Sequence, residues 1–186
     1  MMKTSQYATK ILQELERVVN LIEDDKAEQF VEHILRAKKV FVAGAGRSGL
    51  MARAFAMRMM QMGFDSYVVG ETVTPNLEKD DVLILGTGSG ETKSLVIMAE
   101  KAKSLDASIA VATIFPESTI GQLADVSIKL PAQPKTGEGS GYTSIQPMGA
   151  LFEQSLLVFY DAVILRLMEN QGLDSDTMFS RHANLE

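Results

Sequence analysis

Apolar residues recur along this chain with two different periods, and the change between them divides the sequence. Over residues 4–37 the apolar positions fall at helical spacing, which predicts two amphipathic leading helices over residues 1–37. From Val40 onward, short apolar runs alternate with longer helical patterns. Strands are expected at 40–44, 66–69, 82–86, 108–113 and 126–130, and helices at 48–62, 91–104 and 118–124. This alternation predicts an α/β fold, a three-layer αβα sandwich around a five-stranded parallel sheet.

The last third of the chain departs from this alternation. Residues 131–148 hold three Pro and three Gly without periodicity, and so long a loop inside a compact domain is usually a lid or binding segment. Residues 149–171 then read as a long C-terminal helix that is apolar nearly all round. Such a helix must be buried on every side, so we expect another subunit to cover part of it. Residues 172–186 are expected to form a polar C-terminal tail.

Composition narrows the range of functions. A chain of 186 residues with 46% hydrophobic and 23% charged residues predicts a single domain over 1–186. The net charge of −6 and the lack of a long basic run argue against nucleic acid and anionic membranes as partners. With no Cys and only two His, a metal site is not expected. No signal peptide or membrane-spanning run is evident, so a cytoplasmic location is expected.

Two stretches repeat the same pattern. Residues 40–49 (VFVAGAGRSG) and 82–91 (VLILGTGSGE) each run from an apolar strand through a Gly- and Ser-rich loop into a helix. In a parallel sheet both helix N-termini lie at the same edge, where unpaired N–H groups and the helix dipole favour an anion, most often a phosphate. The candidate phosphate ligands are Gly46, Arg47, Ser48, Thr87, Gly88, Ser89, Gly90, Glu91 and Thr92.

The same loops are open to other interpretations. Residues 44–49 match the dinucleotide fingerprint G-x-G-x-x-G, and Glu71 follows at a suitable distance. The leading helices, the missing second domain and the second, hydroxyl-rich loop favour a compact phosphomonoester over a dinucleotide. Neither loop has the Lys-Ser/Thr of an ATP-binding loop, so no cofactor is expected. The remaining alternative is that the glycines only permit tight turns.

Two further residues could carry chemistry. Glu153 lies in the first turns of the apolar helix, where apolar neighbours would partly desolvate it and strengthen it as a general base. The pattern alone is equally consistent with a carboxylate that only interacts favourably with the helix dipole and has no catalytic role. His182 lies in the polar tail, where a frayed chain end is the usual interpretation.

The two loops resemble the sugar isomerase (SIS) domain, which binds phosphosugars over a five-stranded parallel sheet. The chain resembles more narrowly the 6-phospho-3-hexuloisomerases of that family. The segments that carry this closer match are Ser144–Gly149, Leu151–Gln154 and Arg181–Glu186.

The resemblance implies isomerisation of D-arabino-hex-3-ulose 6-phosphate to D-fructose 6-phosphate through an enediolate, in the ribulose monophosphate pathway of formaldehyde fixation or detoxification. It implies phosphate binding by Ser48 and the 87–92 loop, Glu153 as the proton-transferring base, and a homotetramer. His182 is a candidate for moving the oxygen-bound proton, in its own or a neighbouring subunit's site. Another phosphosugar isomerase, or a phosphosugar-binding regulatory module, remains an alternative.

Overall fold

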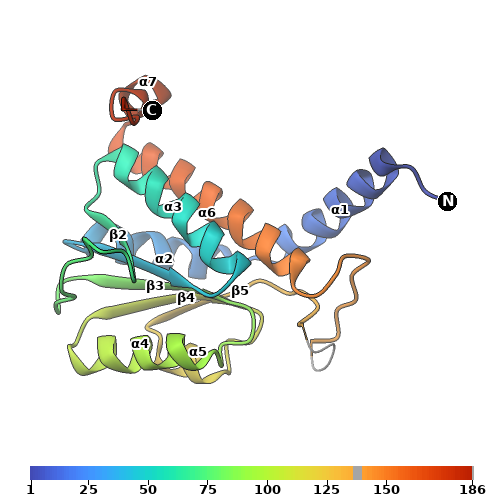
Figure 1. Cartoon of the computed structure of the whole chain (residues 1–186), viewed down its shortest axis with the longest axis horizontal. Helices are drawn as coiled ribbons and strands as arrows, with labels where there is room; N and C mark the ends of the chain where they lie inside the picture. The colour runs from blue at the N-terminus through green and yellow to red at the C-terminus, as the bar shows by residue number, and fades with distance from the viewer. Residues whose placement is uncertain (136–139, 186) are drawn as a thin grey trace.

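The structure, a computed structural model, describes residues 1–135 and 140–185 (Figure 1). Residues 136–139, which fall in the expected 131–148 loop, and Glu186 lie outside the described residues. The helices are α1 (Thr4–Val19), α2 (Asp24–Arg36), α3 (Arg47–Met62), α4 (Lys93–Ser104), α5 (Thr119–Leu123), α6 (Ala150–Gln171) and α7 (Ser175–Phe179). The strands are β1 (Val40–Gly44), β2 (Ser66–Val68), β3 (Val82–Thr87), β4 (Ser108–Thr113) and β5 (Val126–Lys129).

The strands form one parallel sheet in the order β2-β1-β3-β4-β5. Because β1 pairs with β2 on one side and with β3 on the other, the chain changes direction across the sheet after β2. Ligands in open α/β sheets bind at such a switch point, beyond the carboxyl ends of the strands. Gly44 and Gly86 are register partners, so the two Gly- and Ser-rich loops leave the sheet side by side.

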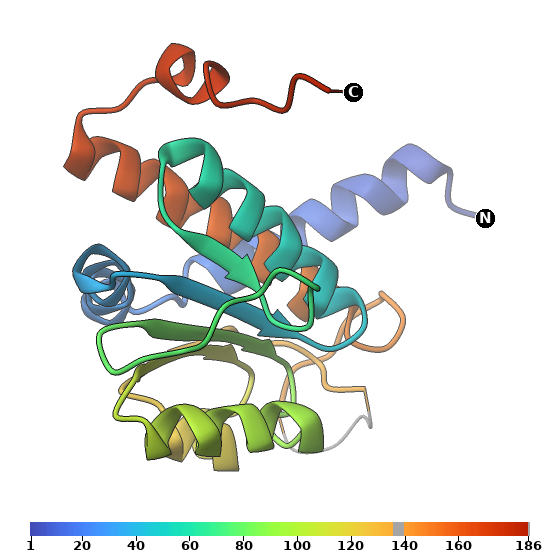
Figure 2. The ribbon, with the colours of Figure 1, turned by 60° about the vertical axis from the view of Figure 1, so that its left-hand side comes forward.

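Helices cover both faces of the sheet, which confirms the predicted three-layer fold (Figures 1 and 2). Successive residues of β1 enter opposite cores: Val40 and Val42 pack on the side of α2, α3 and α6, whereas Phe41 and Ala43 pack on the side of α4. Strands buried on both faces need apolar side chains at every position, and this explains the continuous hydrophobic runs of the sequence.

The long helix α6 is covered by the chain on one side only. It packs against α1, α2 and α3 and buries large side chains such as Phe159 and Tyr160. Val158 and Leu165, on its outward side, are 39% and 66% exposed. The sequence-based expectation that one chain cannot surround this helix agrees with that exposure. In the described part of the chain, neither α6 nor any other helix has the length and apolar content to cross a membrane.

The first and last helices lie at the edges of the layered body. The N-terminal half of α1 extends away from it (Figure 2), and Tyr7 and Leu12 of this helix are exposed. The short helix α7 was not expected, because residues 172–186 read as a polar tail. It forms because the Asp174 carboxylate accepts a hydrogen bond from the Thr177 N–H at 2.8 Å and Met178 docks into the core. A five-residue helix is too short for a periodic signal in the sequence.

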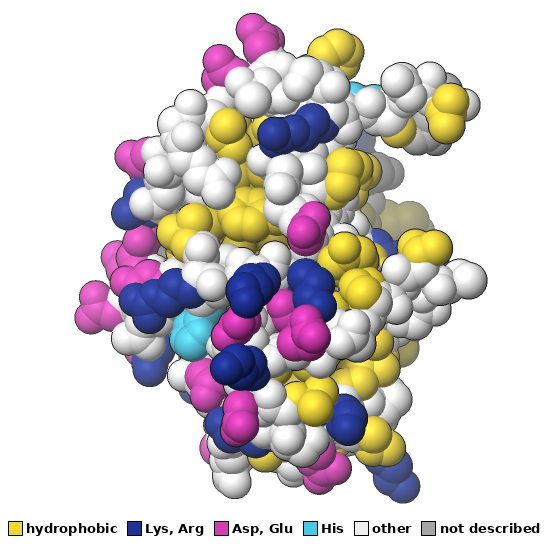
Figure 3. Space-filling view, turned by 90° about the vertical axis from the view of Figure 1, so that its left-hand side faces the viewer, with side chains coloured by type: hydrophobic (Ala, Val, Ile, Leu, Met, Phe, Trp, Pro, Cys, Tyr) yellow, Lys and Arg dark blue, Asp and Glu magenta, His cyan; other side chains and the backbone are white. Residues whose placement is uncertain are grey.

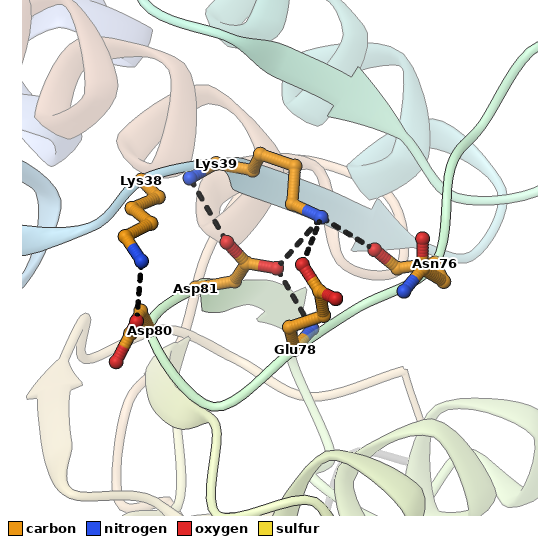
Figure 4. Close-up of polar contacts among 6 residues, drawn as sticks. All are labelled: Lys38, Lys39, Asn76, Glu78, Asp80 and Asp81. Atoms are coloured by element: carbon orange, nitrogen blue, oxygen red, sulfur yellow. Dashed lines mark hydrogen bonds and ion pairs between the residues drawn. The ribbon is translucent and has the colours of Figure 1, made fainter.

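Charged side chains of both signs gather at the amino ends of the strands (Figure 3), where a hydrogen-bonded network joins β1 to β3 (Figure 4). The buried Asp81 carboxylate accepts hydrogen bonds from the backbone N–H groups of Lys39 at 3.1 Å and Glu78 at 2.7 Å. The Lys39 ammonium lies 3.3 Å from the same carboxylate and donates to the Asn76 carbonyl at 2.8 Å. Asp81 therefore ties the starts of the two strands whose far ends carry the Gly- and Ser-rich loops.

Candidate functional site

A cavity of about 170 Å³ lies at the carboxyl edge of the sheet, beyond the ends of β1 and β3. The loops after β1 and β3, the segments after β4 and β5 and the first turn of α6 form its walls. The predicted phosphate ligands that line it are Ser48, Thr87, Gly88, Ser89 and Thr92. Glu153 lines the same cavity, so the structure brings the candidate base and most candidate ligands together.

In the first loop, glycines let α3 begin directly against the end of β1. A Cβ on Gly49 would lie 2.6 Å from the Gly44 carbonyl oxygen, closer than real Cβ atoms come to any neighbour. Gly46 has φ of 58°, in the left-handed region that favours glycine. The tight turn leaves the side chain of Ser48, in the first turn of α3, at the cavity wall.

The second loop is held in shape by its own hydroxyls. Thr87 Oγ1 accepts from the Gly90 N–H at 3.2 Å, and Ser89 Oγ accepts from the Glu91 N–H at 3.2 Å. Each hydroxyl acts as an acceptor in these bonds, so its own proton remains available to a ligand. Gly90 has φ of 66° and a Cβ there would collide with Ser118, so glycine is required.

The two helices that follow the Gly- and Ser-rich loops, α3 and α4, begin without a side-chain cap. Gly46, the residue before α3, has no side chain, and the hydroxyl of Thr92, the residue before α4, makes no capping hydrogen bond. The first-turn N–H groups of an uncapped helix need a partner and carry the positive end of the helix dipole. Two such ends beside the hydroxyls of Ser48, Thr87, Ser89 and Thr92 form a seat suited to a phosphate.

Some predicted ligands lie outside the cavity walls. Gly46 and Gly90 shape the loops but do not line the cavity. The Glu91 carboxylate instead accepts a hydrogen bond from the Thr119 N–H at 2.7 Å, and this bond lowers the pKa of Glu91 below its ordinary value. Glu91 thus caps the start of α5.

Arg47, another candidate ligand, contacts the candidate base. Its guanidinium Nη1 donates to Glu153 Oε2 at 3.1 Å and does not line the cavity. The Lys135 ammonium lies 3.8 Å from the other carboxylate oxygen, Oε1. Glu153 is only 5% exposed, so its predicted burial is confirmed, but its surroundings are not purely apolar. Sequence reasoning missed Lys135 because it lies in a loop whose sequence shows no periodicity or motif.

A second missed residue, Glu14 of α1, anchors the segment that leads into α6. Its carboxylate accepts hydrogen bonds from the Ser144 hydroxyl at 2.7 Å, the Ile145 N–H at 2.9 Å and the Gln146 side-chain amide at 3.0 Å. Burial raises the pKa of Glu14, but these hydrogen bonds outweigh it and hold the pKa below its ordinary value. The leading helix therefore fixes the loop that delivers Glu153 to the cavity.

His182 lies elsewhere within the chain. It follows α7, near the opposite end of α6 from Glu153, and its ring stacks on Phe179 with centroids 5.9 Å apart. It borders a separate surface hollow beside Arg58 and Leu165. A single chain thus does not bring His182 to the cavity.

The site has the components of proton-transfer chemistry on a phosphorylated ligand. A buried carboxylate faces the same cavity as the hydroxyls and the uncapped helix starts. Among the described residues, no group of three or more His, Cys, Asp or Glu side chains is placed to hold a metal ion.

Known proteins are similar to this chain in sequence and in fold. The SIS domain matches residues 33–158. A 3-hexulose-6-phosphate isomerase of Bacillus subtilis is 56% identical over 185 residues, covering 100% of each chain. Another, from Methanocaldococcus jannaschii, is 41% identical over 161 residues, which are 87% of this chain and 84% of the relative.

Solved structures agree with these relatives. A crystal structure from Methanococcus jannaschii, for which the function of 3-hexulose-6-phosphate isomerase was inferred, superposes with a TM-score of 0.84 at 35% identity and covers 97% of this chain and 99% of that one. The chain therefore belongs to the SIS domain family and, within it, to the 3-hexulose-6-phosphate isomerases.

Proposed function

We propose that this protein isomerises D-arabino-hex-3-ulose 6-phosphate to D-fructose 6-phosphate without a cofactor. The full-length relatives support this reaction. One structural observation carries it: the buried Glu153 carboxylate and two uncapped, hydroxyl-lined helix starts open into a single cavity. As the resemblance implies, the reaction would serve the ribulose monophosphate pathway.

The helix starts of α3 and α4 would hold the phosphate. Ser48, Ser89 and Thr92 can donate hydroxyl protons to its oxygens, and the first-turn N–H groups add to them. Charge-assisted hydrogen bonds are each worth about 1.5 to 3 kcal/mol. The phosphate would thereby anchor one end of the sugar, and the reacting carbons would meet Glu153, which lines the same cavity.

Glu153 would act as the base in both halves of the reaction. It removes the proton from C2 of the 3-ketose, the enediolate forms across C2 and C3, and the same carboxyl returns the proton to C3. One carboxylate can serve both carbons because they are adjacent. General acid–base catalysis of this kind contributes about 10² to 10⁴ in rate.

Replacing Ser89 by Ala should raise KM for the sugar phosphate about tenfold or more and leave kcat nearly unchanged, because a hydrogen bond to a charged group is lost in ground and transition states alike. Steady-state kinetics measure this. Ser94→Ala is the matched control, since Ser94 is exposed in the first turn of α4 and does not line the cavity. An unchanged KM in Ser89→Ala would place the phosphate elsewhere.

Incubation with a panel of sugar phosphates in deuterated water, without any cofactor, tests the reaction itself. We expect solvent deuterium at C3 of fructose 6-phosphate formed from the 3-ketose. Mass spectrometry and NMR locate the label. Incorporation into a different sugar only would replace the proposed substrate, and absence of label in all of them would argue against enediolate chemistry.

We further propose that the protein is a homo-oligomer, in keeping with the tetramer that the resemblance implies. Exposed apolar side chains lie on both α3 and α6, including Leu50, Met57 and Leu165. A second copy that covered this face could also carry its own His182 towards a neighbouring cavity. Analytical ultracentrifugation measures the mass of the assembly and so tests this proposal.

We also propose that the protein is cytoplasmic.

A further inference from the structure

Lys135 lies against the candidate base and close to a glycine at the start of α6. Its methylene stem lies over Gly149, at the start of α6, where an added Cβ would come 3.3 Å from Lys135 Cε and 3.7 Å from Glu153 Oε1. The absence of a side chain at Gly149 lets the stem lie close to the helix start. The ammonium Nζ then lies 3.8 Å from Glu153 Oε1.

Lys135 is also the charged partner that the cavity offers to a substrate oxygen. Among the described residues that line the cavity, it carries the only positive charge. Arg47 is held by the other oxygen of Glu153 and does not line the cavity. In the proposed binding mode the hydroxyls and helix starts of the two loops bind the phosphate. The carbonyl oxygen of the sugar therefore needs a different, positively charged partner.

Enediolate formation creates a negative charge that needs such a partner. When Glu153 takes the C2 proton, the C2–H electron pair forms the C2=C3 bond and the carbonyl electrons move onto O3. A carbon that gives its proton to Glu153 must touch the carboxylate, and O3 is only two bonds from that carbon. An ammonium beside Glu153 is therefore well placed for O3, whereas the phosphate on C6 lies several bonds away.

We propose that Lys135 is a catalytic residue that donates a hydrogen bond to the carbonyl oxygen of the substrate and stabilises the enediolate formed there; this inference rests on the proposed isomerase function. The ammonium keeps its proton throughout. The hydroxyl proton passes from O2 to the neighbouring O3, C2=O forms, and Glu153 returns its proton to C3. No oxidant, reductant or co-reactant is consumed.

The test compares Lys135→Gln with Lys129→Gln, an exposed lysine at the end of β5 that does not line the cavity. We expect kcat to fall about 10²- to 10³-fold in Lys135→Gln, as when one donor to a developing oxyanion is removed, with KM nearly unchanged. Lys129→Gln should match the wild type. Because the Lys135 side chain is 62% exposed, the variant should fold normally, and thermal melting checks this.

Two ligands separate this role from the alternatives. Calorimetry compares 4-phospho-D-erythronohydroxamate, whose carbonyl and N-hydroxyl oxygens correspond to O3 and O2 of the enediolate, with D-glucitol 6-phosphate, which has no carbonyl. We expect Lys135→Gln to weaken hydroxamate binding strongly and to leave glucitol phosphate binding nearly unchanged. An equal loss for both ligands would mean that Lys135 binds the phosphate. Unchanged binding of both would mean that Lys135 only orients Glu153; either result overturns the proposal.

These binding measurements do not depend on turnover, so they separate failure of this inference from failure of the proposed function. If the wild type isomerised no sugar in the panel but Lys135→Gln still lost hydroxamate affinity selectively, the reaction would be misassigned and the oxygen contact would stand. If the wild type isomerised the 3-ketose and Lys135→Gln kept its kcat, the contact would be wrong and the reaction would stand.

Discussion

Replacing Glu153 by Gln should lower kcat by about 10³-fold or more while the substrate still binds, because the amide keeps the shape of the carboxylate but cannot accept the C2 proton. Deuterium incorporation from solvent should stop together with turnover, since both require removal of the same proton. Binding of D-glucitol 6-phosphate, measured by calorimetry, should remain close to the wild-type value, because that ligand has no carbonyl and its phosphate is held by the two loops.

Glu169→Gln on the same helix is the control for this prediction. Glu169 lies more than four turns further along α6, where it forms an exposed ion pair with Arg166. Its replacement should leave kcat unchanged. A kcat within about tenfold of the wild type in Glu153→Gln would exclude Glu153 as the base. Loss of glucitol phosphate binding together with kcat would instead mean that the substitution disturbs the cavity as a whole.

Replacing Asp81 by Ala should produce the largest loss of stability among the changes considered. The buried carboxylate accepts two backbone N–H groups and pairs with the Lys39 ammonium at the starts of β1 and β3 (Figure 4). Its removal leaves those N–H groups without this acceptor and the ammonium with weaker partners. We expect a loss of about 2 to 4 kcal/mol, seen in thermal melting as a decrease in Tm of roughly 5 to 15 °C.

Asp80→Ala is the matched control, because Asp80 is the preceding residue and carries the same charge. Its ion pair with Lys38 joins two exposed side chains, which water and salt screen. The Tm of this variant should stay close to that of the wild type. If both variants melted at the same temperature, the network would contribute little through burial, and the register of β1 and β3 would have to come from apolar packing alone.

The fold could be predicted from the sequence because its signals are local and repeated. Each strand is a short apolar run bounded by helical periodicity, and the strands are buried on both faces, so their runs lack polar interruptions. The phosphate loops were equally visible, since a tight turn from strand to helix needs glycines at fixed spacing, as between Gly44 and Gly49. The strand after residue 66 ends earlier than expected, at Val68, and α4 begins later, at Lys93.

Other parts of the site could not be predicted because they join residues that are distant in the sequence. Lys135 and Glu153 carry no shared motif, and they approach each other beside Gly149. Glu14 meets the segment before α6 across about 130 positions of the chain. The sequence predicted Arg47 in the first loop but did not reveal its ion pair with Glu153. The two charges meet only because α3 packs beside the start of α6.

The sequence by itself determined the order of strands and helices, the two loops at one edge of the sheet, and Glu153 at the start of an apolar helix. Local periodicity and glycine spacing suffice for these, because each depends on residues within one or two turns. Only the tertiary structure decided which side chains surround that carboxylate, that Glu91 caps α5, and that His182 lies away from the cavity within one chain. Those outcomes depend on long-range packing, where a side chain's partner is set by the elements that converge on it.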